Sequence, residues 1–240
     1  MERGRSSTVG TSQAAREIQE IAGGLVYCKD DSSIRNGFEI VTHPGTLDFW
    51  LKENGKEIMD SILQRLRSMD YHSELGGRCG YHIHTNKAAI APLHRYNLVR
   101  FVYSQQVRMF LFGLSRRSEG QLSSYSQLTL PEESDGYEAT VDRTAKNIGK
   151  GINNTGRSTV INFSSTHTAE LRLLRGTLDP VKFWAGLQFY NSLLEYTNPK
   201  NQWLGLQEAP AWSSYRQYIE SYPQPVEVAE LRTHLREMGI

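Results

Sequence analysis

Two strings of the sequence, CGYHIHTNK and TAELRLLRGTL, hold the side chains best suited to chemistry. Alternate side chains of a β-strand share a face, so His82 and His84 would project together from the first string. The same spacing brings Glu170 and Arg172 together on the second. Imidazole binds divalent metals, and a guanidinium near a metal-binding carboxylate can hold phosphate. The two strings therefore indicate a metal-and-phosphate site, which is typical of an enzyme rather than of a binding module.

Each of these residues also has a structural interpretation. One imidazole of a short His-x-His pair can be buried and hydrogen-bonded while the other is solvated. Glu170 and Arg172 can form an ion pair of little energetic value on a solvated face. Glu39 lies between two apolar residues, where a carboxylate faces solvent by default or else points into a polar site. Cys79 is a candidate third ligand if the metal is zinc, but no CxxC or HExxH spacing accompanies it.

Further arginines follow these strings. Arg116 and Arg117 close a predicted helix, where compensation of the helix dipole explains two cations more simply than ligand binding does. Arg175 begins an Arg-Gly-Thr turn whose guanidinium and backbone donors could hold phosphate or carboxylate. The sequence contains no Walker motif, no GxGxxG, no GxSxG and no kinase signature. A bound nucleotide would therefore need another architecture.

The composition is that of an ordinary globular protein with one sizeable domain. The 240 residues are 38% apolar and 22% charged, and the net charge of +1 gives no bulk attraction to nucleic acid or membrane. An anionic ligand must therefore be held by a local arginine cluster. Two cysteines fit a reducing cytoplasm, and there is neither a signal-peptide pattern nor an uninterrupted apolar span. We expect a soluble, cytoplasmic protein with no nucleic-acid partner and no membrane partner.

Hydrophobic periodicity predicts strands separated by helices of unequal length. The expected strands are a hairpin within 25–41 and segments at 79–85, 159–163 and 169–174; the expected helices lie over 12–21, 44–69, 92–114, from 179 onward, 209–221 and 224–238. Residues 115–158 are polar with few apolar anchors, which is typical of a surface helix with loops or of an active-site lid. The pattern predicts an α+β fold with a curved, largely antiparallel sheet and helices on one face.

Five strings, taken in order, resemble the amidoligase family, a branch of the carboxylate–amine ligase superfamily that also contains glutamine synthetase and glutamate–cysteine ligase. The matching strings are YCKDDSSIRNGFEIVTHP at 27–44, CGYHIHTNK at 79–87, SRR at 115–117, GRSTVINF at 156–163 and TAELRLLRGTLDPVKFWAGLQF at 168–189. The polar, Gly- and Ser-rich composition of 1–11 predicts a mobile segment, and the amphipathic pattern near the end predicts a C-terminal helical extension at 201–240. The resemblance implies an amidoligase-like catalytic domain at 12–200, within which the polar segment 115–158 is a lid-like insertion. It also favours the metal interpretation of His82.

The resemblance implies a saddle-shaped, mostly antiparallel sheet, as in glutamine synthetase, whose concave face holds ATP and Mg²⁺ or Mn²⁺. In such enzymes the γ-phosphoryl group passes to a carboxylate, and an amine then attacks the acyl phosphate to form an amide. The implied partners are a small-molecule amine and a carboxylate on an amino acid, peptide or protein. Phosphoryl transfer depends mainly on positioning and electrostatics, so no nucleophilic side chain is required.

The resemblance also assigns roles by motif. Glu39 would bind the metal nearer the acyl substrate, and His82 and Glu170 the metal that bridges the ATP phosphates. Arg172 would stabilise the transferring phosphoryl group or hold the carboxylate. Contacts to nucleotide or substrate are implied for His84, Arg116, Arg157 and Arg175, and for Asp31 and Ser33, which match a DGS-type turn with Ser32 in the place of its glycine.

Members of the family normally open with a strand that carries two alternating, metal-binding glutamates, just before a segment like ERGRSS. This sequence starts at Met1-Glu-Arg-Gly, and Glu17 and Glu20 follow a helical pattern. Three accounts stay open: a truncated gene, a strand supplied by another chain, or loss of catalysis; we expect truncation.

Two other functions are weighed beside the ligase. One is a non-catalytic domain that binds nucleotide or a partner, and the other is a zinc hydrolase that uses His82 and His84. The sequence identifies neither the amine nor the carboxylate, and it leaves a homo-oligomer open. The resemblance suits a bacterial or phage source.

Overall fold

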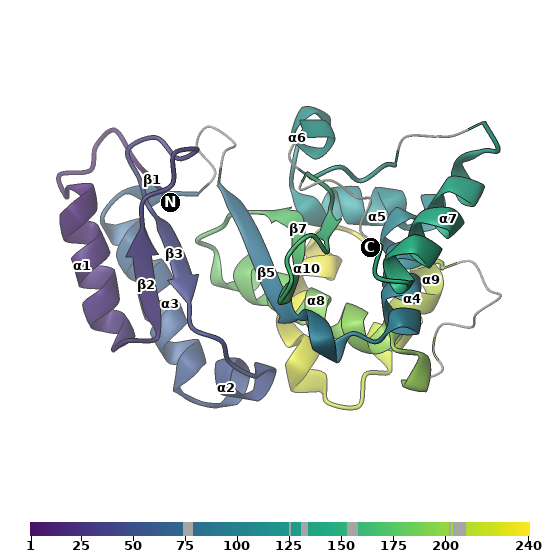
Figure 1. Ribbon diagram of the computed structural model, residues 1–240. Helices are drawn as coiled ribbons and strands as arrows, with labels where there is room; N and C mark the ends of the chain where they lie inside the picture. The colour runs from purple at the N-terminus through teal and green to yellow at the C-terminus, as the bar shows by residue number, and fades with distance from the viewer. Residues whose placement is uncertain (74–78, 125, 131–133, 153–157, 202, 204–209) are drawn as a thin grey trace. The chain divides into compact units, whose positions relative to one another are not determined.

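The computed structural model describes the whole chain except residues 74–78, 125, 131–133, 153–157, 202 and 204–209 (Figure 1). The chain divides into two compact units, each built of helices and short strands. The first unit comprises Met1–Gly80 and Arg175–Trp184, and the second comprises Tyr81–Leu174 and Ala185–Ile240. The strand pairs whose register is described run antiparallel, so the mixed architecture with small antiparallel sheets is confirmed. In the described part of the chain, no helix has the length and apolar character needed to cross a membrane.

The first unit contains the predicted hairpin and the helices around it. Its elements are β1 (Glu2–Arg3), α1 (Thr11–Ala22), β2 (Val26–Lys29), β3 (Glu39–Thr42), α2 (Leu47–Lys52), α3 (Asn54–Ser68) and β4 (Tyr71–His72). Helix α1 buries Ala14, Ile18 and Ala22, which recur every fourth residue and therefore share one side. It ends at Gly23, whose φ of 55° lies in the left-handed region that glycine adopts without strain.

The N-terminal residues, expected to be mobile, make defined contacts in the first unit. Strand β1 pairs with β4, and the backbone N–H of Gly4 donates to the carbonyl of Asp70 at 2.7 Å. The hydroxyl of Ser6 donates to the Asp70 carboxylate at 2.6 Å. A Cβ on residue 4 would collide with Asp70, so glycine is the residue that this close approach requires. Backbone pairing, which composition does not report, orders this segment.

The start of helix α8 (Pro180–Thr197) belongs to the first unit through Trp184, which is fully buried. Its indole N–H donates to Asp60 of α3 at 2.7 Å, and the Lys56 ammonium lies 4.6 Å from the centre of the ring. An aromatic ring whose polar edge is satisfied in this way can be buried at little cost.

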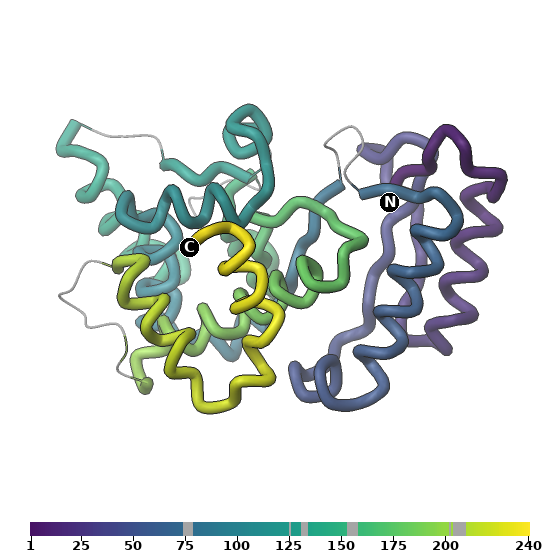
Figure 2. Tube along the Cα trace, turned by 180° about the vertical axis from the view of Figure 1, so that it is seen from behind, coloured from purple at the N-terminus to yellow at the C-terminus, as the bar shows by residue number. Residues whose placement is uncertain are grey.

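The second unit holds a three-stranded sheet and the larger group of helices, whose course can be followed from behind in Figure 2. Its elements are β5 (Gly80–Asn86), η2 (Lys87–Ala89), α4 (Pro92–Tyr103), α5 (Gln105–Ser115), α6 (Glu119–Ser124), α7 (Tyr137–Gly149), β6 (Ile161–Asn162), β7 (Thr168–Arg175), the remainder of α8, η3 (Pro199–Asn201), α9 (Trp212–Glu220), η4 (Pro225–Val228) and α10 (Ala229–Glu237). The strand order is β5-β7-β6, so β7 is central.

The predicted long helix over 92–114 is two helices, α4 and α5, with a break at Ser104. Ser104 has an extended backbone, with φ of −64° and ψ of 133°. Its hydroxyl accepts a hydrogen bond from the N–H of Gln106 and donates one to the carbonyl of Pro210 at 3.0 Å. A serine that caps the second helix can stop the first, although the apolar pattern continues through the break.

Segment 115–158 contributes to the core more than its composition indicates. Helix α7 buries Val141, Ala145 and Ile148, which lie at helical spacing on one side. These three residues join the same buried cluster as α4 and α5. The spacing of few apolar residues, rather than their number, determines the packing of this helix.

Helix α8 is apolar on more than one side. Phe183, Leu187, Tyr190 and Leu194 have the spacing of one helix face, but of these four only Tyr190 is fully buried. Along the part of α8 in the second unit, the other fully buried large side chains are Phe189, Leu193 and Tyr196. Such a helix is covered on several faces, and a single stripe cannot describe it.

Candidate functional site

The alternation predicted for the two strings is present in the sheet of the second unit. In β5, Ile83 is buried, whereas His82 and His84 lie on the more exposed face. In β7, the buried residues Ala169 and Leu171 flank Glu170 in sequence. Ile83, Ala169 and Leu171 belong to the apolar cluster that the helices cover. The polar side chains therefore gather on the opposite face of the same strands.

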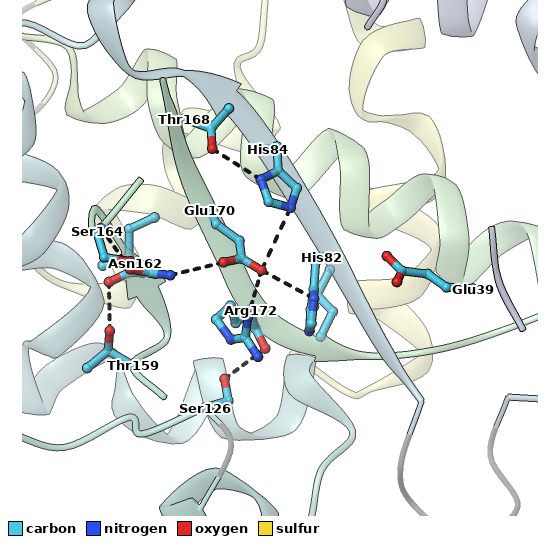
Figure 3. A network of polar contacts seen from close by, with 12 residues as sticks. Glu39, His82, His84, Ser126, Thr159, Asn162, Ser164, Thr168, Glu170 and Arg172 are labelled. Atoms are coloured by element: carbon cyan, nitrogen blue, oxygen red, sulfur yellow. Dashed lines mark hydrogen bonds and ion pairs between the residues drawn. The ribbon is translucent and has the colours of Figure 1, made fainter. Parts of the chain in front are cut away.

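Glu170 is the centre of this polar face (Figure 3). Its Oε1 lies 2.8 Å from Nη1 of Arg172, 3.2 Å from Nδ1 of His82 and 3.7 Å from Nε2 of His84. Glu170 itself is only 8% exposed. Three residues predicted from the two strings thus converge on one oxygen of a fourth, Glu170.

The sequence analysis missed Asn162, which holds the other oxygen of this carboxylate. Asn162 of β6 lies directly opposite Glu170 in the antiparallel register, and its Nδ2 donates to Oε2 at 3.1 Å (Figure 3). Asn162 is 6% exposed. The signal was present, because Ile161-Asn162-Phe163 has the same apolar–polar–apolar alternation as Ala169-Glu170-Leu171. Both carboxylate oxygens are therefore hydrogen-bonded from neighbouring side chains.

The pKa of His82 is lowered from its ordinary value, which favours the neutral imidazole although the side chain is about one third exposed. Desolvation by burial is the largest cause that lowers the pKa of His82, and the Arg172 guanidinium lowers it further. The Glu170 carboxylate acts in the opposite direction, and Arg117 adds to the lowering. A neutral imidazole is the form that binds metal ions.

Arg117 is a second residue whose contribution the sequence analysis missed. Its guanidinium is buried and donates to the carbonyls of Leu173 at 3.0 Å and Leu174 at 2.8 Å. It thus fixes the chain of β7 just beyond the site, and its charge reaches His82. Arg116, the residue predicted from the same string, instead ends helix α5 in a left-handed conformation with φ of 56°. A role for the Arg116 side chain, in ligand binding or in compensation of the helix dipole, stays a prediction.

Three further predicted residues, Glu39, Asp31 and Ser33, belong to the first unit. Glu39 of β3 is in the first unit, where it pairs with Lys29 of β2 at 3.1 Å. Asp31 and Ser33, also in the first unit, form a local turn in which the Asp31 carboxylate accepts from both the N–H and the hydroxyl of Ser33.

Arg175 and Arg157 are the two remaining arginines predicted for the site. Arg175, the last residue of β7, is assigned to the first unit. Arg157 lies outside the described residues. The participation of Glu39, Asp31, Ser33 and Arg175 in the Glu170 site stays a prediction.

The fit of a metal ion can be judged from the donor atoms. Among the described residues, no group of three or more His, Cys, Asp or Glu side chains is arranged to hold one. The separation of 3.2 Å between His82 and Glu170 nevertheless suits two adjacent ligands. Ligands about 2.1 Å from a metal lie about 3.0 Å apart in octahedral and about 3.4 Å apart in tetrahedral geometry. The separation of these two atoms is thus compatible with two adjacent ligands, although it equally fits the direct contact between the two side chains.

Comparisons of the chain with protein-family models, with curated proteins and with solved structures find no match.

Proposed function

We propose that the protein is an ATP-dependent carboxylate–amine ligase with a glutamine synthetase-like catalytic fold, and that the Glu170 site holds the metal and the phosphate groups. The observation that carries this proposal is the convergence of His82, His84 and Arg172 on one oxygen of Glu170. A carboxylate and a neutral imidazole suit a divalent cation, and a guanidinium suits phosphate.

The requirements of Mg²⁺ support this assignment. Mg²⁺ keeps several waters and is commonly bound by one or two carboxylates together with substrate phosphates. His82 and Glu170 would hold the ion, or Mn²⁺ in its place, and the bound ion would neutralise charge on the phosphates. An incomplete set of protein ligands is therefore compatible with a site that is completed by the nucleotide.

The local charge supports an anionic ligand. Two guanidinium groups, Arg172 and Arg117, act on His82, whereas the net charge of the chain is only +1. Nε of Arg172 is buried and has no hydrogen-bond partner among the described residues. A phosphate oxygen could reach this Nε only if the side chains that cover it moved, so the charge of the guanidinium, rather than its buried donor, is what suits an anion. These observations favour phosphate close to Arg172.

The reaction divides into two steps whose atoms balance. A carboxylate oxygen of the substrate attacks the γ-phosphorus of ATP, and the bond from that phosphorus to the bridging oxygen breaks to release ADP. The amine then attacks the acyl carbon, and inorganic phosphate and one proton leave as the amide forms. Arg172 would stabilise the charge on the transferring group, which is the main catalytic demand of such a step. Glu39 would contribute on the side of the acyl substrate, as the resemblance implies.

A hydroxylamine assay tests the proposal without knowledge of the amine. The full chain is incubated with Mg·ATP, hydroxylamine and each of the twenty amino acids in turn, and ADP and hydroxamate are measured. We expect ADP release that depends on Mg²⁺ and on one carboxylate, and its loss in Glu170→Gln and Arg172→Lys. Glu220→Gln is the matched control, because Glu220 pairs with Arg216 on the surface of α9 at 2.9 Å.

Nucleotide affinity separates the competing functions. Calorimetry with Mg·ATP that detects no binding would overturn the ligase proposal. Binding without turnover on any carboxylate would support the non-catalytic alternative. Stoichiometric zinc in the purified protein, with hydrolysis that needs no ATP, would support the zinc hydrolase, which calls for three protein ligands.

A further inference from the structure

Lys87, the last residue of the string CGYHIHTNK, holds the turn that joins β6 to β7. Its ammonium donates to the carbonyl of Phe163 at 2.6 Å and to that of Ser165 at 2.8 Å. Its backbone N–H donates to the carbonyl of His167 at 2.9 Å. Three hydrogen bonds from one residue thus fix three positions of a five-residue connection.

This turn orients the side-chain amide of Asn162. The backbone N–H of Ser164 lies between the two carbonyls that Lys87 holds, and it donates to Oδ1 of Asn162 at 2.9 Å. An amide whose oxygen accepts from Ser164 must present its nitrogen on the other side. That nitrogen, Nδ2, donates to Oε2 of Glu170 at 3.1 Å (Figure 3). Hydrogen bonds and the backbone of the turn therefore connect Lys87 to Glu170 without a gap.

The two oxygens of Glu170 consequently have different partners. Oε2 is occupied by Asn162, so Oε1 is the oxygen that faces His82, His84 and Arg172. Without the Asn162 amide, the carboxylate could rotate and exchange the two oxygens. Hydrogen bonds of this kind, made by residues behind a metal ligand, orient that ligand and raise its affinity for the ion.

The position of Lys87 is electrostatically costly. Desolvation lowers the pKa of Lys87, and the nearby Arg95 guanidinium lowers it further. Arg95 itself donates to the carbonyls of Ile90 and Lys87, so it is fixed beside the ammonium. A lysine placed against another cation and aimed at backbone carbonyls is unlike a solvated surface lysine.

We propose that Lys87 is a positioning residue for Glu170, acting through the β6–β7 turn and Asn162 to keep Oε1 directed at the ligand. The effect of Lys87 on metal binding rests on the proposed function. Its effect on the orientation of the Glu170 carboxylate does not depend on that function.

The test compares Lys87→Met with the wild-type chain. Methionine keeps an unbranched apolar side chain and removes the three ammonium donors. We expect hydrogen exchange of the Ser164 amide to accelerate by at least about tenfold, because that N–H loses its fixed partner. We expect the affinity for Mn²⁺ alone, measured from the paramagnetic resonance of the free ion, to fall between about 10- and 100-fold.

The control is Lys146→Met on α7, which removes a lysine that pairs with Asp142 and has a 60% exposed side chain. It should leave both measurements unchanged. Asn162→Leu should lower the affinity for Mn²⁺ as much as Lys87→Met does, and the double variant should lose no more than either single one. Lys87→Arg, which keeps several donors, should restore most of the protection of Ser164.

Each outcome decides the inference. Wild-type exchange at Ser164 in Lys87→Met overturns it, and so do additive losses in the double variant. If Lys87→Met does not fold, full affinity for Mn²⁺ in Asn162→Leu overturns it. If the wild-type chain binds no Mn²⁺, the metal part of the proposed function fails, and the exchange of Ser164 still decides the role of Lys87.

Discussion

Glu39 and Glu170 occupy the same kind of position in the sequence and have different surroundings in the structure. Each is a carboxylate between two apolar neighbours on a strand. Glu39 pairs with Lys29 across a two-stranded hairpin, and its side chain is 38% exposed. Glu170 lies on the central strand of three and is flanked by Asn162 on one side and His82 on the other. Alternation therefore selects the face of a strand, whereas the neighbouring strands decide whether that face becomes a polar site.

The largest difference should appear on truncation of the two carboxylates. Glu170→Ala removes the partner of Arg172 and Asn162, and we expect it to lower the free energy of unfolding by about 1–3 kcal/mol. Glu39→Ala removes one partner of an exposed pair and should cost less than about 1 kcal/mol. Urea unfolding of the two variants gives both values. Equal losses would mean that the neighbouring strands do not set the energetic value of the two carboxylates.

Loss of Asn162 should have the next largest effect. Asn162→Leu leaves Oε2 of Glu170 without its donor in a largely buried place, and we expect a loss of about 1–2 kcal/mol. Asn162→Asp should be no better, because it sets a second carboxylate against Glu170. Both variants are measured by urea unfolding beside wild type. Wild-type stability in Asn162→Asp would contradict the orientation assigned to this side chain.

Acid should weaken the second unit through a buried imidazole. Burial lowers the pKa of His94, and the Leu194 carbonyl opposes this. The unfolded chain takes up the proton near pH 6.5, before the folded chain does. Stability should therefore fall as the pH drops below about 6.5, by at most about 1.4 kcal/mol per pH unit from this residue. Between pH 7 and about 4.5, the free energy of unfolding should depend less steeply on pH in His94→Gln than in wild type. An unchanged slope would show that His94 does not contribute to the acid sensitivity.

The smallest effect is expected for the exposed pair itself. Lys29→Met removes the cation opposite Glu39, and the loss should be about 0.5 kcal/mol or less. It should also vanish in 1 M salt, because surface ion pairs are screened. The free energy of unfolding of the variant is measured at low and at high salt beside wild type. A larger loss that persists in salt would place Glu39 among the buried carboxylates.

Residue alternation was sufficient to predict the strands that carry the site. The strand with His82 and the strand with Glu170 follow from period two, because polar and apolar residues alternate along the part of each that carries the site. The hairpin of β2 and β3 follows from two short apolar runs separated by a polar turn that begins at Asp30. Helix α1 follows equally well from its apolar spacing. These elements are local, and their side chains report their own surroundings.

Long-range partners could not be predicted in the same way. The break at Ser104 involves the carbonyl of Pro210, more than one hundred residues away in the sequence. Asn162 acquires its role only because the register places it opposite Glu170. Arg117 turns to the carbonyls of β7, whereas its neighbour Arg116 ends the helix, and the two arginines are identical in sequence terms. Pairing and capping of this kind depend on the assembled fold.

Strand β7 presents Glu170 and Arg172 on one face and Leu171 and Leu173 on the other. Insertion or deletion of a single residue before Glu170 within this strand would shift the register of the residues that follow by one position. Their side chains would then exchange the two faces of the sheet. Leucines would then occupy the polar site, and two charges would enter the core. An insertion of two codons would restore the alternation. In related sequences, insertions and deletions within β7 should therefore comprise even numbers of residues. Insertions and deletions of a single residue should occur only in the segments on either side of the strand.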